Sequence, residues 1–184
     1  MSDDAAAKRR AKQTVINLLL SLAATLGIVI VTVLAVPRDD SNRIQPVDYK
    51  TAVSQAESAS GLDILAPELP QGWWSNRAKW RGATADGVRY FETGFVGPKN
   101  QYVRLVQAFD VNPTWVALAS KDFKPNTDSS VQNDAWTKWI STDEKSVDPF
   151  LWTLEKEGQF ISLNGGYETD IAKFAKVIEM ELSR

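Results

Sequence analysis

The sequence predicts an α+β domain, in which antiparallel strands pack on helices, behind a single N-terminal transmembrane helix. Three observations indicate this arrangement. Residues 14–36 contain no charged residue. Six later segments have the alternation or the β-branched and aromatic content that is typical of strands. Helical patterns precede, separate and follow two groups of three such segments, and this order (α-βββ-α-βββ-α) favours one antiparallel sheet covered by helices.

The apolar segment is long enough to cross a bilayer. Thr14 to Val36 is 23 residues, and a helix rising about 1.5 Å per residue would span a hydrocarbon core of roughly 30 Å. Basic residues at positions 8–10 and 12 precede it directly. The positive-inside rule therefore predicts a cytoplasmic tail at residues 1–13 and an extracytoplasmic domain, with the protein in the plasma membrane. The alternative is a cleaved signal peptide, although its apolar region is usually only about 7–15 residues long.

The polar and small residues of this segment are predicted to share one helix face. Spaced at about 100° per residue, they form one stripe: Asn17, Ser21, Ala24, Thr25 and Thr32. Such a stripe is typical of close contact between helices in lipid, so an integral membrane protein or complex is the expected partner. The alternative is a lone helix whose hydroxyls bond their own backbone. That alternative leaves Asn17 unexplained.

Residues 37–46 are predicted to be a linker, and residues 47–184 the outer domain. Asp48 has the position of an N-cap, and Gly61 is expected to end the first helix of the domain. Pro70 and Gly72 fit positions i+1 and i+3 of a type I turn. The first three strands are then predicted at residues 74–80, 88–96 and 102–109.

The second half of the domain repeats this pattern. Asn112-Pro113 predicts a helix start, and Trp115, Leu118 and Ala119 are spaced as its buried stripe. Residues 124–135 are predicted to be a polar loop. Three further strands are expected at residues 136–140, 150–155 and 159–163, before a helix that follows Gly165-Gly166. The buried face of this helix is predicted to contain Ile171, Phe174, Ala175, Ile178 and Leu182.

The composition excludes several kinds of chemistry. The chain has no cysteine and no histidine, so thiolate metal sites, cysteine nucleophiles and histidine general bases are absent. No cofactor or metal motif is present. Acidic pairs at Asp143-Glu144 and Glu155/Glu157 lie in or beside predicted turns, which does not favour an enzyme. Residues beyond 36 carry four more acidic than basic side chains, which argues against a nucleic-acid partner.

Aromatic and basic residues suggest a candidate binding surface. Alternation places Trp73 and Trp74 on opposite faces of the chain, and Trp136 and Trp139 likewise, so that one of each pair should be exposed. Exposed tryptophan is a common anchor for proteins and sugars; the alternative is that these rings fill the core. Basic residues of neighbouring strands are predicted to share one face: Arg77, Lys79, Arg81 and Arg104. They would meet anionic lipid or cell-wall polymer, unless they are simply a solvated face.

The chain resembles an uncharacterised family of actinobacterial membrane-anchored envelope proteins, the domain of unknown function 4245. The resemblance covers nearly the whole chain, beginning with the basic tail and the apolar helix. Its motifs are Val47-Asp48-Tyr49, Ile64-Leu65-Ala66-Pro67, Leu69-Pro70-x-Gly72-Trp73, Thr93-Gly94-Phe95 and Tyr102-Val103-x-Leu105-x-Gln107. The resemblance implies a single-pass envelope protein. It supplies no reaction and no catalytic residues.

The expected function is therefore that of a non-enzymatic accessory or interaction subunit of a membrane protein complex. The second hypothesis is an extracytoplasmic binding module for a lipid, glycan or peptide that uses the aromatic surface. A hydrolase is the third and would require a pocket with two carboxylates of separated pKa.

Overall fold

The computed structural model describes residues 3–35, 45–82 and 84–183, which form two units divided between Arg43 and Ile44. The first unit is helix α1 (Asp3–Ala35), within which residues 12–32 are long and apolar enough to cross a membrane, with a mean hydropathy of 2.4. A signal sequence has the same properties. The helix begins at Asp3, so the predicted tail continues the apolar helix without a break. Most of the predicted linker and Val36 lie outside the described residues.

The second unit begins with helix α2 (Tyr49–Ser60), whose two ends are as predicted. The carboxylate of Asp48 accepts a hydrogen bond from the Thr51 amide at 3.1 Å. Gly61 has a φ of +70° and donates its amide to the Glu57 carbonyl at 2.8 Å. These contacts satisfy backbone groups that a helix leaves unpaired at its ends.

Seven antiparallel strands form one sheet in the order β1-β2-β3-β7-β6-β5-β4. The first half supplies β1 (Trp74–Arg81), β2 (Arg89–Val96) and β3 (Tyr102–Phe109). The second half supplies β4 (Phe123–Pro125), β5 (Thr137–Ser141), β6 (Phe150–Lys156) and β7 (Gln159–Gly165). The halves meet where β3 pairs with β7. The antiparallel α+β class is thus as predicted, although the second half has four strands.

The predicted polar loop and the predicted turn at Pro70 both differ from the structure. The predicted polar loop begins inside β4, a three-residue edge strand whose proline faces no further strand. An edge position tolerates proline because the missing N–H is not needed there. The predicted type I turn is also out of register: the Trp73 amide donates to the Pro70 carbonyl at 3.0 Å, so Pro70 is residue i. Gly72 is residue i+2, where its φ of +80° is the conformation that glycine tolerates.

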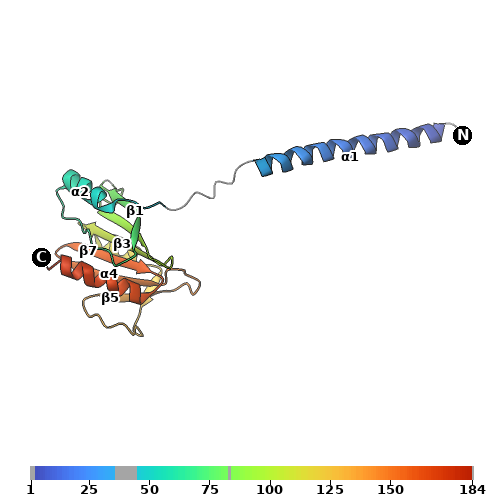
Figure 1. Cartoon of the computed structure of the whole chain (residues 1–184). Helices are drawn as coiled ribbons and strands as arrows, with labels where there is room; N and C mark the ends of the chain where they lie inside the picture. Colours follow the sequence, from blue (N-terminus) through green and yellow to red (C-terminus); the bar gives the residue numbers. More distant parts are fainter. Residues whose placement is uncertain (1–2, 36–44, 83, 184) are drawn as a thin grey trace. The chain divides into compact units, whose positions relative to one another are not determined.

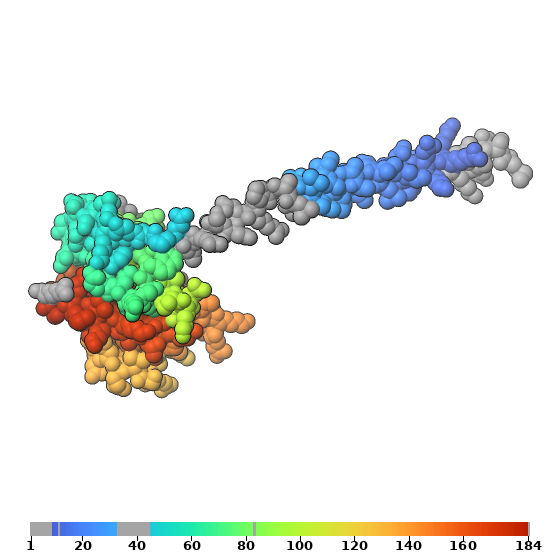
Figure 2. Space-filling model, in the orientation of Figure 1, coloured from blue at the N-terminus to red at the C-terminus, as the bar shows by residue number. Residues whose placement is uncertain are grey.

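Helices α2 and α4 (Glu168–Glu181) cover the same face of the sheet, and both are in front of it in Figure 1. Both also lie on the viewed side of the space-filling model, α2 in cyan and α4 in red (Figure 2). The core beneath them includes Phe95 and Phe174, whose rings stack at 4.9 Å. Ile171, Phe174, Ala175 and Ile178 of α4 are fully buried there, which confirms four residues of the predicted stripe. The fifth, Leu182, follows the last residue of α4 and is only partly buried against the core.

On the opposite face, the helix among the described residues is α3 (Pro113–Ala119), which packs over one end of the sheet. Its predicted start is confirmed, because the Asn112 side chain accepts a hydrogen bond from the Trp115 amide at 2.9 Å. Its predicted buried stripe is wrong. No residue of α3 is buried, and Leu118 is 59% exposed. A helix of seven residues reaches only the end of the sheet around Ala108 and Phe160, so the rest of this face remains open.

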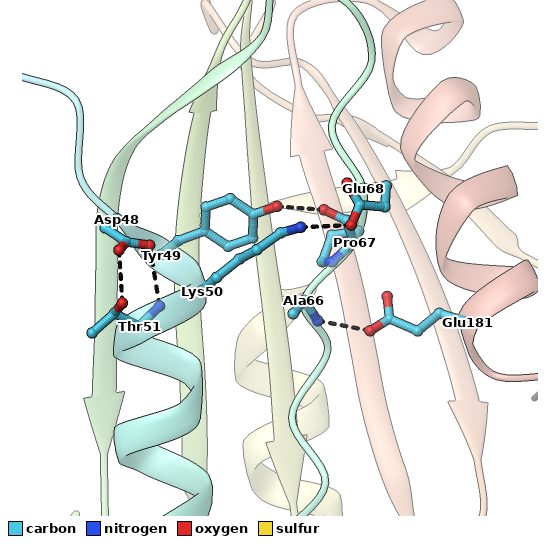
Figure 3. A network of polar contacts seen from close by, with 8 residues as sticks. All are labelled: Asp48, Tyr49, Lys50, Thr51, Ala66, Pro67, Glu68 and Glu181. Carbon is cyan, nitrogen blue, oxygen red and sulfur yellow. Dashed lines mark hydrogen bonds and ion pairs between the residues drawn. The ribbon is translucent and has the colours of Figure 1, made fainter.

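A polar network joins three separate segments at the start of α2 (Figure 3). The Tyr49 hydroxyl donates to the Pro67 carbonyl at 2.6 Å. One residue before that proline, the Ala66 amide donates to the Glu181 carboxylate of α4 at 2.8 Å. The irregular segment around residue 66 is therefore held between the first and the last helix of the domain.

Candidate functional site

A groove of about 580 Å³ lies on the open face of the sheet. Strands β2, β3, β7 and β6 form its floor, α3 and Phe123 form one wall, and residues 84–86 form another. Its apolar lining includes Tyr90, Val106, Trp115, Leu118, Ala119, Phe123 and Leu151. Its polar lining includes Thr84, Asp86, Arg104, Ser162 and Asn164. The volume lies within the range of clefts that bind small molecules.

The aromatic wall of the groove is built from rings that support one another. The ring centroids of Trp115 and Phe160 are 5.4 Å apart in an edge-to-face arrangement. Trp115 also contacts Tyr90, with 6.2 Å between the centroids. Such contacts add to the stability that area burial provides. The wall is therefore held in place by the small cluster under α3 rather than by the main core.

The polar end of the groove centres on Arg104. Its Nε lies 2.9 Å from one carboxylate oxygen of Glu92, and Arg77 lies 2.9 Å from the other. The Glu92 side chain is only 9% exposed, whereas the Arg104 side chain is 44% exposed. Lys79 is opposite Glu92 in the strand register. One buried carboxylate thus faces two guanidinium groups, and Lys79 adds a third basic residue to the same face, so this part of the sheet has more basic than acidic side chains.

Asn164 lies beside Arg104 in the register of β3 and β7. Both hydrogens of its side-chain amide are used, because they are donated to the carbonyls of Asp148 and Phe150 at 2.9 Å each. These two bonds orient the amide, and its oxygen accepts no hydrogen bond from the described residues. Together with the hydroxyl of Ser162, it gives the polar end of the groove neutral hydrogen-bonding groups beside the cation.

Two carboxylates near the groove have shifted pKa values of opposite sign. The pKa of Asp86 is lowered, first by the side-chain hydrogen bond from Thr84 and further by the Val88 amide. Its charge is therefore stabilised within its own turn. The pKa of Asp148 is raised because burial disfavours the charged form. Asp86 is the one carboxylate that lines the groove among the described residues.

The strand register brings the predicted basic residues together on the open face. Arg77 and Arg104 both pair with Gly94, from β1 and β3 respectively, and so lie in one row across the sheet. Lys79 and Arg81 follow Arg77 along β1 with alternate spacing. The sequence interpretation missed Glu92, which lies between these residues. One signal could have identified Glu92: it lies on the strand between the two strands that carry the basic residues, at a position of the same alternating face.

The structure places one tryptophan of each candidate pair on the core side and the other on the open face. Trp73 and Trp136 belong to the core side: Trp73 contacts the Phe174 ring edge-on at 4.9 Å, and Trp136 is only 4% exposed. Trp136 is therefore not a surface residue, because its ring is buried and its N–H is donated to Glu179. Trp74 and Trp139 are partly buried on the open face. Trp115, which the sequence interpretation assigned to a buried stripe, lines the groove instead.

The predicted partner face of α1 lies on one continuous helix, and its side chains are exposed. Thr25 and Thr32 donate their hydroxyls to carbonyls four residues earlier, at 2.8 and 2.7 Å. These bonds satisfy both hydroxyls within the helix. The Asn17 side chain makes no hydrogen bond within the described residues. Ser21 and Ala24 complete the same face.

Comparison with known proteins places the chain among sequences without an assigned activity. The model of one family, described as "Protein of unknown function (DUF4245)", matches residues 10–177. No curated protein and no solved structure matches the chain. Within the described residues there is no group of three or more metal-ligating side chains.

Proposed function

The chain belongs to the DUF4245 family of proteins of unknown function, and from this premise we propose that it is a membrane-anchored binding protein of the cell envelope. The observation that carries this proposal is the groove on the open sheet face. It combines an aromatic wall with a few polar groups at one end, which is the usual composition of a small-molecule site. We propose that the groove binds its ligand without chemical conversion.

The helix and its flanks support the location. Residues 12–32 have the length and hydropathy of a membrane span, and basic residues lie on the N-terminal side. An anchored chain would then keep its N-terminus in the cytoplasm and hold the domain outside. The apolar surface of α1, which includes exposed Leu18, Ile28 and Val31, would face lipid.

The side chains of the groove support binding rather than catalysis. General acid–base catalysis requires a group that can exchange a proton near the operating pH. Asp86 is the carboxylate in the lining, and its lowered pKa and its bonds within its own turn favour the charged form throughout the neutral range. The chain has no histidine or cysteine to take that role.

The proposal can be tested by offering the full chain, in a neutral detergent, to extracts of envelope lipids and glycans. Native mass spectrometry should then detect a bound small molecule. Leu118→Asp places a charge at the exposed edge of the groove and should abolish the adduct. Met180→Asp is the matched control, because Met180 is 50% exposed on α4, on the other face of the sheet. No adduct from any fraction, or equal adducts for all three proteins, would contradict the proposal.

A second function, an accessory subunit of a membrane complex, is favoured by Asn17. An amide without a partner is costly in the hydrocarbon core, so a neighbouring helix is proposed to satisfy it. The chain lacks cysteine, which permits crosslinking from single introduced thiols. Ala24→Cys, on the stripe, should crosslink to the partner. Leu26→Cys, which lies on the opposite side of the helix at about 100° per residue, should not. Equal crosslinking from both positions would count against a defined partner face.

A further inference from the structure

We infer that the ligand of the groove is an anionic amphiphile: one negatively charged head group bound at Arg104, and one apolar chain that runs along Val106 towards Trp115. This inference rests on the proposed function and specifies the chemistry of the ligand. The proposed source is the lipid of the membrane on which the protein is anchored. Residues 36–43 connect α1 to the domain in the sequence, so a chain anchored by α1 would tether the domain to a membrane that contains this lipid.

The charge arrangement selects an anion. The ion pair with Glu92 uses Nε of Arg104, which leaves the two terminal nitrogens of the guanidinium available to a carboxylate or phosphate. Glu92 must also neutralise Arg77, at 2.9 Å, and Lys79 lies opposite it in the register. Asp86, the carboxylate of the lining, belongs to the turn before β2, whereas Arg104 lies in the row of Gly94 towards the other end of that strand. At the Arg104 end a single carboxylate, Glu92, is shared by two guanidinium groups, so this end attracts negative charge.

The rest of the lining selects an apolar chain. From Arg104, the floor continues along the same strand to Val106, a buried side chain one row closer to Phe160 and Trp115. Leu151, also buried, lies across the sheet in the row of Arg104 and Asn164 and lines the side of the groove. The wall above them consists of Trp115 and Leu118. Leu118 is left 59% exposed on a helix that has no buried residue. An apolar chain placed here would remove this exposed surface from water, which stabilises the complex in proportion to the area buried.

The basic group at Arg104 and the apolar wall at Trp115 and Leu118 lie in different parts of the groove, and this separation decides which class of ligand fits. A free inorganic anion would be bound only by the Arg104 end and would leave the aromatic wall exposed. A neutral or cationic amphiphile would bury the wall but would leave the excess positive charge without a counter-ion. Only a molecule with both parts satisfies the whole groove.

The test uses the full chain in nanodiscs of zwitterionic phosphatidylcholine, with empty nanodiscs as the blank, and titration calorimetry. Octyl phosphate is the probe; octyl glucoside, octyltrimethylammonium and inorganic phosphate are the comparators. Octyl phosphate should bind at least about tenfold more tightly than each comparator, since a hydrogen-bonded charge pair contributes at least about that factor. Nanodiscs that contain phosphatidylglycerol should weaken octyl phosphate binding, because the membrane lipid competes for the groove.

Variants assign the two ends of the site. Arg104→Gln should weaken octyl phosphate binding about tenfold and leave octyl glucoside binding unchanged, and Arg104→Lys should restore part of the loss. The fold should tolerate both, because Glu92 keeps its ion pair with Arg77. Arg89→Gln is the matched control, because Arg89 pairs with Asp110 outside the groove. Leu118→Asp should weaken binding of every octyl probe.

The outcomes separate this inference from the proposed function. If octyl glucoside binds as tightly as octyl phosphate and Arg104→Gln has no effect, the anionic head is wrong while ligand binding in the groove stands. If inorganic phosphate binds as tightly as octyl phosphate, the apolar chain is wrong. If phosphatidylglycerol does not compete, the membrane source is wrong. If Leu118→Asp changes the binding of no probe, the groove is not the site and the proposed function fails as well.

Discussion

Single side chains connect the irregular segments of this domain to its core. Gln107, in the central strand β3, is only 2% exposed. Its oxygen accepts the Leu65 amide at 2.7 Å, and its nitrogen donates to the Asp63 carbonyl at 3.0 Å. Tyr49 has the same role for the start of α2, where its hydroxyl bonds Pro67. Buried polar groups with satisfied partners therefore hold a segment that has no regular backbone ladder.

The hydroxyl of Tyr49 should make stability depend on pH in alkaline solution. Burial, followed by the nearby charges of Glu68, Glu181 and Asp48, raises the pKa of Tyr49 to about 12. Tyrosine in the unfolded chain titrates near about 10. A raised pKa in the folded state stabilises the protein below that value, and this contribution is lost as the pH rises from about 10 to about 12. The free energy of unfolding of the wild type should therefore fall more steeply in this range than that of Tyr49→Phe.

Denaturant unfolding at several pH values between 9 and about 12 would measure this difference. Tyr167→Phe is the control, because Tyr167 is 62% exposed, and its profile should follow the wild type. Below pH 10, Tyr49→Phe should be less stable by about 1 kcal/mol, since one hydrogen bond is lost. Parallel profiles for the wild type and Tyr49→Phe would show that the phenol is not protected by the fold.

At the scale of elements, α4 holds more than its own face of the sheet. Its Glu179 accepts hydrogen bonds from the side chains of Trp136 at 2.7 Å and Asn133 at 2.8 Å. Glu168, at the other end of the helix, accepts one from Asn126 at 3.0 Å. The long connection between β4 and β5 contains no strand. These side-chain hydrogen bonds attach both of its ends to α4.

Glu179→Ala should release the C-terminal part of this connection. Two donors lose their acceptor, and each loss costs about 1–3 kcal/mol when the donor is buried. Amide hydrogen exchange at residues 131–136 should therefore become about tenfold faster or more, while exchange in β2 and β3 stays slow. Lys176→Ala on the same helix is the control, because Lys176 is exposed and should leave exchange unchanged. Unchanged exchange in Glu179→Ala would mean that backbone packing alone holds the connection.

The elements differ in how well the sequence predicts them. The caps at Asp48, Gly61 and Asn112 and the stripe of α4 are confirmed because they depend on neighbours within a few residues. The exposure of Leu118 was not predictable, because the apolar residues of α3 have the spacing of a helix with one buried face. Which of them are buried depends on how much of the sheet lies beneath the helix, and the sequence of α3 does not determine this. Strand β4 was missed because three residues are too few for a pattern.

At the scale of the molecule, the chain consists of the apolar helix and a domain that starts at Ile44. In the described part of the chain, the three hydrophobic clusters draw their buried residues from Tyr49 onward. The domain has one continuous sheet, two helices over its main core, and a more weakly covered opposite face. This asymmetry, in a domain without disulfides, is what leaves room for the groove.

Residues 44–184 should therefore fold without the apolar helix. The midpoint of thermal unfolding should lie within about 2 °C of that of the full chain in detergent, since the difference in free energy should be well below 1 kcal/mol. This fragment should also stay in solution when cells are fractionated, whereas the full chain should sediment with membranes and resist alkaline extraction. Aggregation of the fragment, or a much lower midpoint, would show that the domain depends on the preceding residues.

The candidate site was only partly predictable. The register places Arg77 and Arg104 in one row of one face, and this much was accessible from the sequence because alternation along strands is a local property. The sequence interpretation could not identify Tyr90, Trp115 and Phe123 as neighbours in a groove, since they come from β2, α3 and β4. It also left open which tryptophan of each pair faces outward, and Trp136 is the member of its pair that α4 covers.

By itself, the sequence determined the apolar helix, the α+β class and most boundaries of helices and strands, because each follows from periodicity, charge or capping over a few neighbouring residues. Only the tertiary structure decided that β3 pairs with β7 and that Glu92 lies between two arginines. Only the tertiary structure also decided that α3 covers one end of the sheet and leaves a groove beside it. The reason is physical: pairing and burial depend on residues far apart in the chain, and local patterns contain no information about which distant surfaces meet.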